Sequence, residues 1–241
     1  MTAQSPTVVL VHGAFAESAS WNGVIERLTA NGIDTLAVAN PLRSLVGDAA
    51  YLRDVIATID APIVLVGHSY GGMVITEAAS DLDKVAALVF VAAFAPETGE
   101  TALELSGRFP GSTLGDAIST YPTTAGGNEF AIRADAFHRQ FAADVPDATA
   151  ALMAATQRPV TEAALTTGLP TEAPAWKQRP SWFVFGDSDL NIPVELHRQL
   201  AARAESRGTR ELAGASHALS VSAPDAVASV VLDAVRSVTD D

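Results

Sequence analysis

Apolar positions along the first ninety residues follow two alternating patterns. Helical spacing of apolar residues marks three segments, at about Trp21–Ala30, Asp48–Ile59 and Tyr70–Ala79. Between them lie short, mostly unbroken apolar runs typical of strands buried on both faces, at Val8–Val11, Thr35–Val38, Ile63–Val66 and Leu88–Val91. Alternation of this kind predicts parallel strands joined by right-handed helical crossovers, and therefore a three-layer α/β sandwich.

The pattern changes from Pro96 to about Pro180, where Gly and Pro breaks separate helical segments and no strongly apolar strand stands out. The strand–helix alternation then resumes with strands at 182–185 and 209–212 and helices at about 193–204 and 224–235. We therefore expect a single domain with a mainly parallel six-stranded sheet. Its core would be 1–95 and 181–241, with a helical cap inserted at 96–180.

Composition narrows the choice of partners. The chain has 28 Asp and Glu against 15 Lys and Arg, a net charge of −13, so nucleic acid and acidic membranes are poor partners. It has no cysteine, which excludes disulfides, thiolate metal ligands and a cysteine nucleophile. The N-terminal residues lack the basic start and long apolar stretch of a secretory signal peptide. No apolar run reaches the roughly 18 residues that a membrane-spanning helix needs. A soluble cytoplasmic protein of open oligomeric state is expected, with the acidic end Thr239–Asp241 solvated.

A serine follows the third predicted strand within Gly67-His68-Ser69-Tyr70-Gly71 and opens a helix. A G-x-S-x-G pattern between a strand and a helix predicts a nucleophile elbow, since larger residues two positions either side of the serine would collide in so sharp a turn. The helix that follows directs its positive end at a developing oxyanion. Ser69 is therefore the candidate nucleophile.

The first strand ends in a similar way, with His12-Gly13-Ala14-Phe15. One interpretation is that this segment is only a tight turn, in which Gly13 is needed for its backbone freedom. The alternative, which we favour, is that this loop donates one backbone N–H to an oxyanion. Ala14 and Tyr70 are then the two predicted donors.

Of the five histidines, His217 is the candidate base, because it lies on a loop between the last strand and the last helix. His197, beside Arg198, is expected on a solvated helix face. For the acid, Asp189 fits a loop after the fifth strand that turns a carboxylate toward the imidazole. Asp187 and Glu97 remain alternatives, although Asp187 is more typical of a turn.

Four sequence motifs in this order resemble the α/β-hydrolase family over nearly the whole chain: VVLVHGAF, GHSYGG, GDSDLNIP and GASHAL. The chain begins directly on a core strand. In this it resembles the compact branch of the family, which holds plant-type methyl esterases, hydroxynitrile lyases and pyrethroid-type carboxylesterases. The resemblance implies roles for Ser69, Asp189, His217, Ala14 and Tyr70 as above. Hydroxynitrile lyases carry Thr, Glu and Lys where Gly13, His68 and Ala218 stand, so cyanohydrin cleavage is disfavoured. A serine rather than an aspartate at position 69 disfavours the dehalogenase and epoxide hydrolase branches.

The predicted function is hydrolysis of a small to medium, apolar or aromatic carboxylic ester or lactone through an acyl-enzyme, with no metal or organic cofactor required. Phe15 is the best pocket candidate. Phe137, Phe141 and Met153 in the cap could form a substrate wall, although residues at helical spacing more often serve packing. Two alternatives stay open: cofactor-free oxygenase, perhydrolase or lyase chemistry, and a receptor-like member that only binds its ligand.

Overall fold

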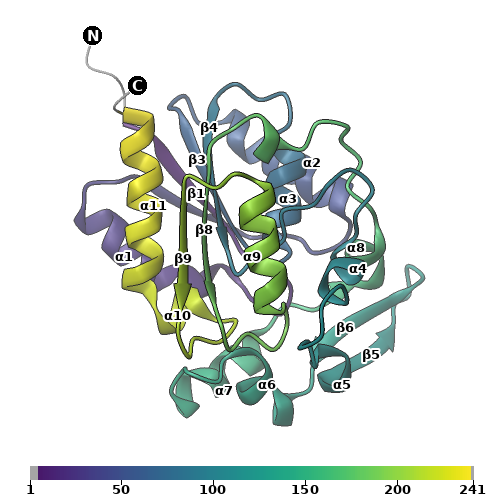
Figure 1. The fold of residues 1–241 in the computed structure, drawn as a ribbon. Coiled ribbons are helices and arrows are strands. Elements are labelled where there is room, and N and C mark those ends of the chain that lie inside the picture. The colour runs from purple at the N-terminus through teal and green to yellow at the C-terminus, as the bar shows by residue number, and fades with distance from the viewer. Residues whose placement is uncertain (1–4, 240–241) are drawn as a thin grey trace.

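A six-stranded parallel sheet forms the centre of the protein, seen here in a computed structural model that describes residues 5–239 (Figure 1). Every neighbouring pair in the sheet is parallel. In spatial order the strands are β2 (Thr35–Val38), β1 (Thr7–Val11), β3 (Ile63–His68), β4 (Val85–Val91), β8 (Ser181–Gly186) and β9 (Gly208–Leu212). The predicted six-stranded parallel sheet is thus confirmed. Asp240 and Asp241 of the expected solvated end lie outside the described residues.

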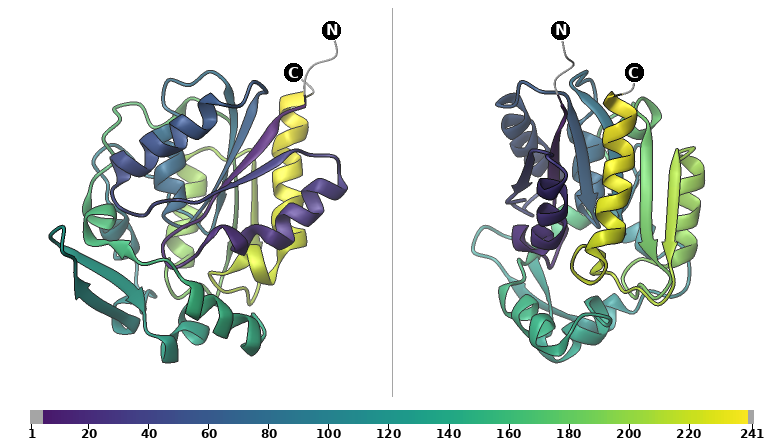
Figure 2. Two further views of the ribbon diagram at one scale, coloured as in Figure 1. Left: turned by 180° about the vertical axis from the view of Figure 1, so that it is seen from behind. Right: turned by 90° about the vertical axis from the view of Figure 1, so that its left-hand side faces the viewer.

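Helices cover both faces of the sheet, and the alternation of side chains along β1 shows why. Val9 and Val11 pack into the core beneath α2 (Leu45–Ala57), α3 (Gly71–Ala78) and α9 (Val194–Arg203). Val8 and Leu10 point to the other face, which α1 (Asn22–Ala30) and α11 (Pro224–Thr239) cover. Because strands buried on both faces need apolar residues at every position, the unbroken apolar runs follow directly from the three layers (Figures 1 and 2).

Residues 96–180, called here the insertion, connect β4 to β8. Figure 1 shows much of this segment below the carboxyl ends of the parallel strands. Its elements are α4 (Ala102–Ser106), α5 (Leu114–Ala117), β5 (Ile118–Pro122), β6 (Asn128–Ile132), α6 (Ala134–Phe141), α7 (Asp147–Thr156), β7 (Val160–Thr161), α8 (Glu162–Thr166) and the 3-10 helix η2 (Ala175–Lys177). Two further short helices border the site, η1 (Ser18–Trp21) and α10 (Leu219–Ser222).

The insertion contains the expected helices, but it also holds the antiparallel sheet β5-β6-β7, which was not predicted. Apolar patterning could not reveal this sheet: four of the five residues of β5 are exposed. The local indication was the pair Gly126-Gly127 between β5 and β6, where both glycines adopt positive φ, 94° and 78°. A Gly-Gly pair of this kind is a typical β-hairpin turn.

Candidate active site

Ser69 occupies a sharp turn between β3 and α3. Its φ of 54° lies in the left-handed region, which is strained for a residue with a side chain. Three backbone hydrogen bonds hold it there: its N–H donates to Val91 at 3.2 Å, and its carbonyl accepts from Gly72 at 3.0 Å and from Phe94 at 3.2 Å. The strained conformation is therefore fixed by the surrounding strands, as a nucleophile elbow requires.

Glycines bring the surrounding backbone within contact of the elbow. A Cβ on Gly71 would lie 2.4 Å from the Val11 carbonyl oxygen, and one on Gly67 would lie 2.7 Å from the Gly71 carbonyl. A Cβ on Gly13 would lie 2.6 Å from Cβ of Ser69. Gly13 is not among the glycines with positive φ. Glycine is therefore needed at this position because the backbone approaches Ser69 closely, and not because of its backbone freedom. The loop after β1 and the elbow thus touch.

The same contact places two unused backbone donors near the serine. Among the hydrogen bonds of residues 5–239, neither the N–H of Ala14 nor that of Tyr70 has an acceptor, whereas the N–H of Phe15 donates to the Arg158 carbonyl at 3.1 Å. Ala14 and Tyr70 also border the same cavity as Ser69. Their N–H groups have the placement that an oxyanion hole needs. The Tyr70 phenol is occupied elsewhere, donating to the buried Asp48 at 2.9 Å.

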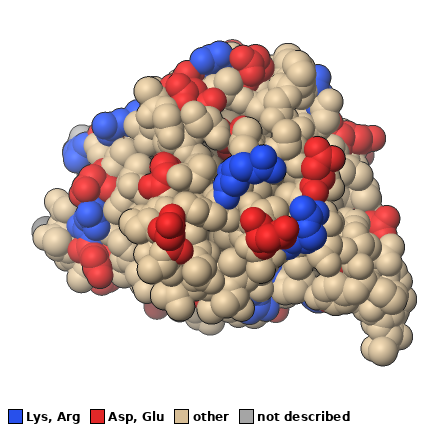
Figure 3. Space-filling view, turned by 90° about the horizontal axis from the view of Figure 1, so that it is seen from below, with Lys and Arg blue, Asp and Glu red and all other residues tan. Residues whose placement is uncertain are grey.

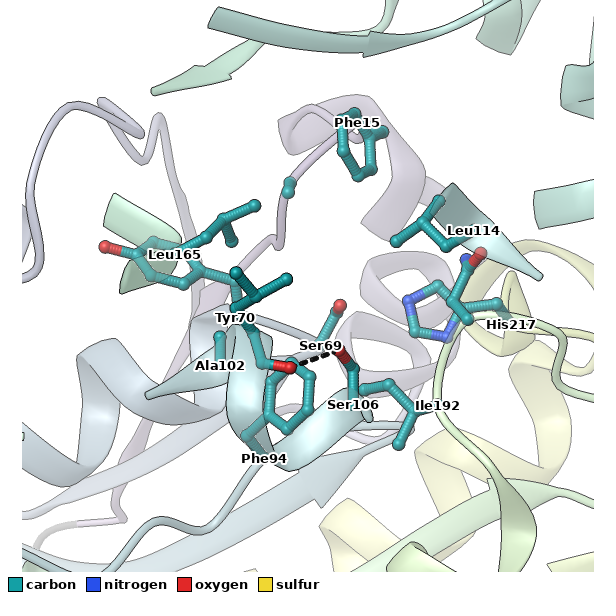
Figure 4. Close-up of a pocket in the computed structure, with 13 residues that line it drawn as sticks. Phe15, Ser69, Tyr70, Phe94, Ala102, Ser106, Leu114, Leu165, Ile192 and His217 are labelled. Atoms are coloured by element: carbon teal, nitrogen blue, oxygen red, sulfur yellow. Dashed lines mark hydrogen bonds between the residues drawn. The ribbon is translucent and has the colours of Figure 1, made fainter. Parts of the chain in front are cut away.

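His217 and Asp189 form a buried pair. Nδ1 of His217 lies 2.6 Å from Oδ2 of Asp189, and both side chains are at most 1% exposed. Oδ1 of Asp189 accepts the backbone N–H groups of Asn191 at 2.7 Å and Ile192 at 3.0 Å. Because Nδ1 is engaged, Nε2 is the nitrogen left to face the serine, and the His217 ring and Ser69 border one cavity (Figure 4).

The two alternative acids are engaged elsewhere. Asp187 accepts the Gly214 N–H at 2.7 Å and the Ser188 hydroxyl at 3.0 Å, as a turn-forming aspartate does. Glu97 forms an ion pair with Lys177 at 2.5 Å. Of the three carboxylates, Asp189 alone contacts the histidine.

A second histidine, His197 of α9, also contacts Asp189, which sequence reasoning missed. Its Nε2 lies 3.3 Å from Oδ2 of Asp189, and its ring stacks on Phe185 with centroids 5.0 Å apart. The expectation of a solvated position is wrong: His197 is 1% exposed, while its neighbour Arg198 is paired with Glu211 at the surface. The buried neighbours Leu196, Leu200 and Ala201 indicated that this side of α9 faces the core.

Charge around Asp189 favours the ionised carboxylate. Burial by itself raises the pKa of Asp189, but the positive potential and hydrogen bonds of His217 and His197 outweigh it and hold the pKa well below its usual value. An ionised carboxylate only accepts hydrogen bonds, so both histidine nitrogens facing it carry protons. Asp189 can therefore orient the His217 ring and stabilise its imidazolium form.

Two more buried histidines flank the elbow without titrating near neutral pH. Burial lowers the pKa of His68 to about 3 and that of His12 to about 4. Nε2 of His68 lies 3.0 Å from the carbonyl of His217, and Nδ1 of His12 lies 2.9 Å from the Gly13 carbonyl. Both rings thus hydrogen-bond to the backbone of the loops that carry the site.

Ser69 and His217 border a small, mainly apolar cavity of about 60 Å³, the nucleophile cavity (Figure 4). Phe15 lines it, as predicted. Sequence reasoning missed the other large apolar side chains, which come from loops of the core and from α4, α5 and α8: Phe94, Leu103, Leu114, Leu165 and Ile192. Their spacing gave no signal, because they converge from separate elements.

Of the remaining substrate-binding candidates, two lie outside the nucleophile cavity in the packed core, and the third borders another cavity. Phe137 and Phe141 do not border the cavity; they are at most 1% exposed and stack with centroids 5.1 Å apart. Phe141 packs edge-on against the His217 ring, with centroids 5.0 Å apart, so it supports the histidine from behind. Met153 borders a second cavity on the far side of Phe15.

Within residues 5–239, no cluster of three or more His, Asp or Glu side chains could hold a metal ion, and no helix has the length and hydropathy to span a membrane. Figure 3 views the molecule from the side of the insertion. It shows acidic and basic side chains interspersed between wide uncharged areas, with neither sign gathered into a large patch on this face. The charged groups of this face therefore form no single attractive field for an ionic ligand.

The site and fold can now be set beside known proteins. The sequence profile of the alpha/beta hydrolase family matches residues 8–230. The chain is 36% identical over 113 residues to the carbendazim hydrolyzing esterase of Nocardioides sp. (strain SG-4G), a match that spans 40% of this chain and 46% of that esterase.

Two solved structures share the fold over nearly their full length. Polyneuridine aldehyde esterase superposes with a TM-score of 0.79 at 22% identity, covering 95% of this chain and 99% of that one. A pyrethroid hydrolase from Sphingobium faniae JZ-2 superposes with a TM-score of 0.76 at 21% identity, covering 99% and 100%. The resemblance inferred from the four motifs is confirmed: this chain belongs to the alpha/beta hydrolase family.

Proposed function

We propose that this protein hydrolyses carboxylic esters through an acyl-enzyme on Ser69. The observation that carries the proposal is the buried pairing of His217 Nδ1 with Asp189 at 2.6 Å beside a serine held at a φ of 54°. A histidine fixed in this tautomer presents Nε2 as a general base, and the strained turn exposes the serine hydroxyl to the cavity. The esterase and hydrolase relatives named above support the same reaction class.

In the proposed reaction, Nε2 of His217 takes the Ser69 proton as Oγ attacks the ester carbonyl. The N–H groups of Ala14 and Tyr70 donate to the resulting oxyanion, an interaction worth about 3 kcal/mol per donor in such sites. The tetrahedral intermediate collapses as His217 returns the proton to the leaving alcohol, leaving the acyl group on Oγ. Water then attacks the acyl-enzyme with His217 again as the base, which releases the acid and regenerates the serine.

The lining of the nucleophile cavity limits the substrate. Apart from the reacting groups, its side chains are predominantly apolar, and no positively charged side chain lines it. An anionic substituent would lose its hydration without gaining a partner. The preferred substrate is therefore a small to medium, uncharged or aromatic ester, or a lactone of the same character.

Covalent labelling and alcohol partitioning test this function together. A fluorophosphonate is expected to add once to the wild-type protein, with the modified peptide containing Ser69, and not to add to Ser69→Ala. With methanol present, phenyl and p-nitrophenyl esters of one acid should give the same ratio of methyl ester to free acid, because both pass through one acyl-enzyme. Labelling at another residue, or hydrolysis with no methyl ester formed, would contradict the proposal.

A further inference from the structure

A second and larger cavity lies beyond Phe15. Its volume is about 370 Å³, and it is an open cavity bordered by the loop after β1, by η1 and the start of α1, by α7 of the insertion and by α10. Phe15 lines both this cavity and the nucleophile cavity, so the two lie on either side of this residue. We call the larger space the outer cavity.

The two volumes suit different parts of one ligand. At about 60 Å³, the nucleophile cavity is several times smaller than the outer cavity and suits the reacting group rather than a long substituent. Sites for drug-sized ligands measure about 300–1,000 Å³, a range that the outer cavity reaches at about 370 Å³. An ester with one extended arm therefore fits the molecule only if that arm leaves the nucleophile cavity.

Exposed apolar side chains at both cavities point to an apolar arm. Leu152 of α7 lines the outer cavity and is 68% exposed, and Leu103 of α4 lines the nucleophile cavity and is 57% exposed. Covering such side chains with apolar ligand atoms is favourable in proportion to the area removed from water. Met153 adds a flexible apolar surface beside Leu152, whereas Glu17 in the same wall disfavours a carboxylate.

The dividing residue is held in an unusual conformation. Phe15 has a φ of 62°, a genuine strain for a bulky side chain, and it is only 4% exposed. The hydrogen bond from its N–H to the Arg158 carbonyl, at 3.1 Å, ties it to the insertion just after α7. The wall between the cavities is thus built jointly by the loop beside the elbow and by the insertion.

We propose that the outer cavity is the binding site for an extended, neutral apolar arm of the ester whose carbonyl is attacked by Ser69, with Phe15 as the partition between reacting group and arm. This inference rests on the proposed function and adds the place where substrate length is selected. Each methylene bound there should raise kcat/KM about threefold to fourfold.

The test compares kcat/KM along two ester series. One is p-nitrophenyl alkanoates from acetate to octanoate, which lengthens the acyl arm; the other is alkyl acetates from methyl to octyl, which lengthens the alcohol. In wild type, kcat/KM should rise with length in at least one series.

Leu152→Asp should lower the ratio of kcat/KM for the longest ester to that for the shortest in that series about tenfold, because a charge then lines the arm's path. Val46→Asp is the matched control: Val46 is 56% exposed on α2, lines neither cavity, and should keep the wild-type ratio.

Three results would overturn the inference: both series flat in wild type, a long-to-short ratio that Leu152→Asp leaves unchanged, or a ratio lowered only by Leu103→Asp, which would place the arm elsewhere. The acetate rate separates this failure from failure of the function itself. If acetate is hydrolysed by wild type and not by Ser69→Ala, the esterase stands whatever the length dependence shows.

Discussion

At the scale of single residues, the carboxylate of Asp189 is held in place by more hydrogen bonds than the side chains of Ser69 or His217. Four donors converge on its buried carboxylate: the rings of His217 and His197 and the backbone N–H groups of Asn191 and Ile192. Hydrogen bonds to a charged group are worth about 1.5–3 kcal/mol each, and an unpaired buried charge would be strongly destabilising. These hydrogen bonds explain how the carboxylate stays ionised although its side chain is fully buried.

His197→Phe removes one of these donors while preserving the stacking on Phe185. With one donor fewer, Asp189 orients the His217 ring less firmly. We expect kcat to fall about tenfold with little change in KM, an effect of the size of one weak hydrogen bond to a charged group. The measurement is ester hydrolysis at about pH 7.5 with kcat and KM determined separately.

His197→Gln, which keeps an N–H donor, should restore part of kcat. Arg198→Gln, on the exposed side of the same helix, should leave kcat and KM unchanged. An equal loss of kcat in His197→Phe and His197→Gln would mean that His197 only fills space in the core.

The proposed reacting residues could be selected from the sequence because each lies in a short motif after a strand, where its context is local. His197 could not be identified in the same way, since its contact depends on how the loop after β8 folds back over α9. Similarly, the spacing of Phe137 and Phe141 marks the apolar face of α6, but the sequence alone does not distinguish packing against the core from lining of a cavity.

At the scale of elements, the elbow depends on close packing of the β3–α3 turn against the end of β1. A Cβ on Gly71 would lie 2.4 Å from the Val11 carbonyl oxygen, at the end of β1. Such an overlap involves backbone on both sides and cannot be relieved by turning a side chain.

Gly71→Ala should therefore lower the free energy of unfolding by about 1–3 kcal/mol, as overpacking does, and reduce ester turnover by displacing Ser69. Gly115→Ala is the matched control, because a Cβ there meets nothing within 4 Å. Urea denaturation and initial rates would be measured for both variants. Equal stability of the two variants would contradict the account of the close contact.

The four central strands β1, β3, β4 and β8 were predictable because burial on both faces leaves nearly continuous apolar runs, whereas the edge strands β2 and β9 are largely unburied and were placed by the strand–helix alternation. The hairpin β5–β6 was not predictable, because β5 is mostly exposed and β6 is mostly half-buried, so neither strand carries a continuous apolar run. The lining of the nucleophile cavity was equally hidden: Leu114 and Leu165 lie on separate short helices that only the tertiary fold brings together.

At the scale of the whole molecule, buried neutral histidines make stability depend on pH. The pKa values of about 4 for His12 and about 3 for His68 lie below the 6.5 of an exposed histidine. Below pH 6.5 the unfolded chain binds protons that the folded protein does not, so stability is lost as the pH falls. The loss should be about 2 kcal/mol for each of these residues between pH 7.5 and pH 5.

Urea denaturation at pH 7.5 and pH 5 measures this loss in wild type and in His12→Asn. The variant has no titrating group at that position, so its stability should fall by about 2 kcal/mol less than that of wild type over the same interval. Because other titrating groups are common to both proteins, they cancel in the comparison. An equal fall in both would show that His12 is not kept neutral by burial.

The central claim is that Ser69 attacks the ester carbonyl, and the most direct test is hydrolysis of p-nitrophenyl acetate and butyrate by wild type and Ser69→Ala side by side, with unfolding curves for both. If Ser69 is the nucleophile, wild type should turn over both esters and the folded variant should lose at least a thousandfold in rate, as for removal of other serine nucleophiles. Equal turnover in both proteins, or none in wild type on any ester, would contradict this claim.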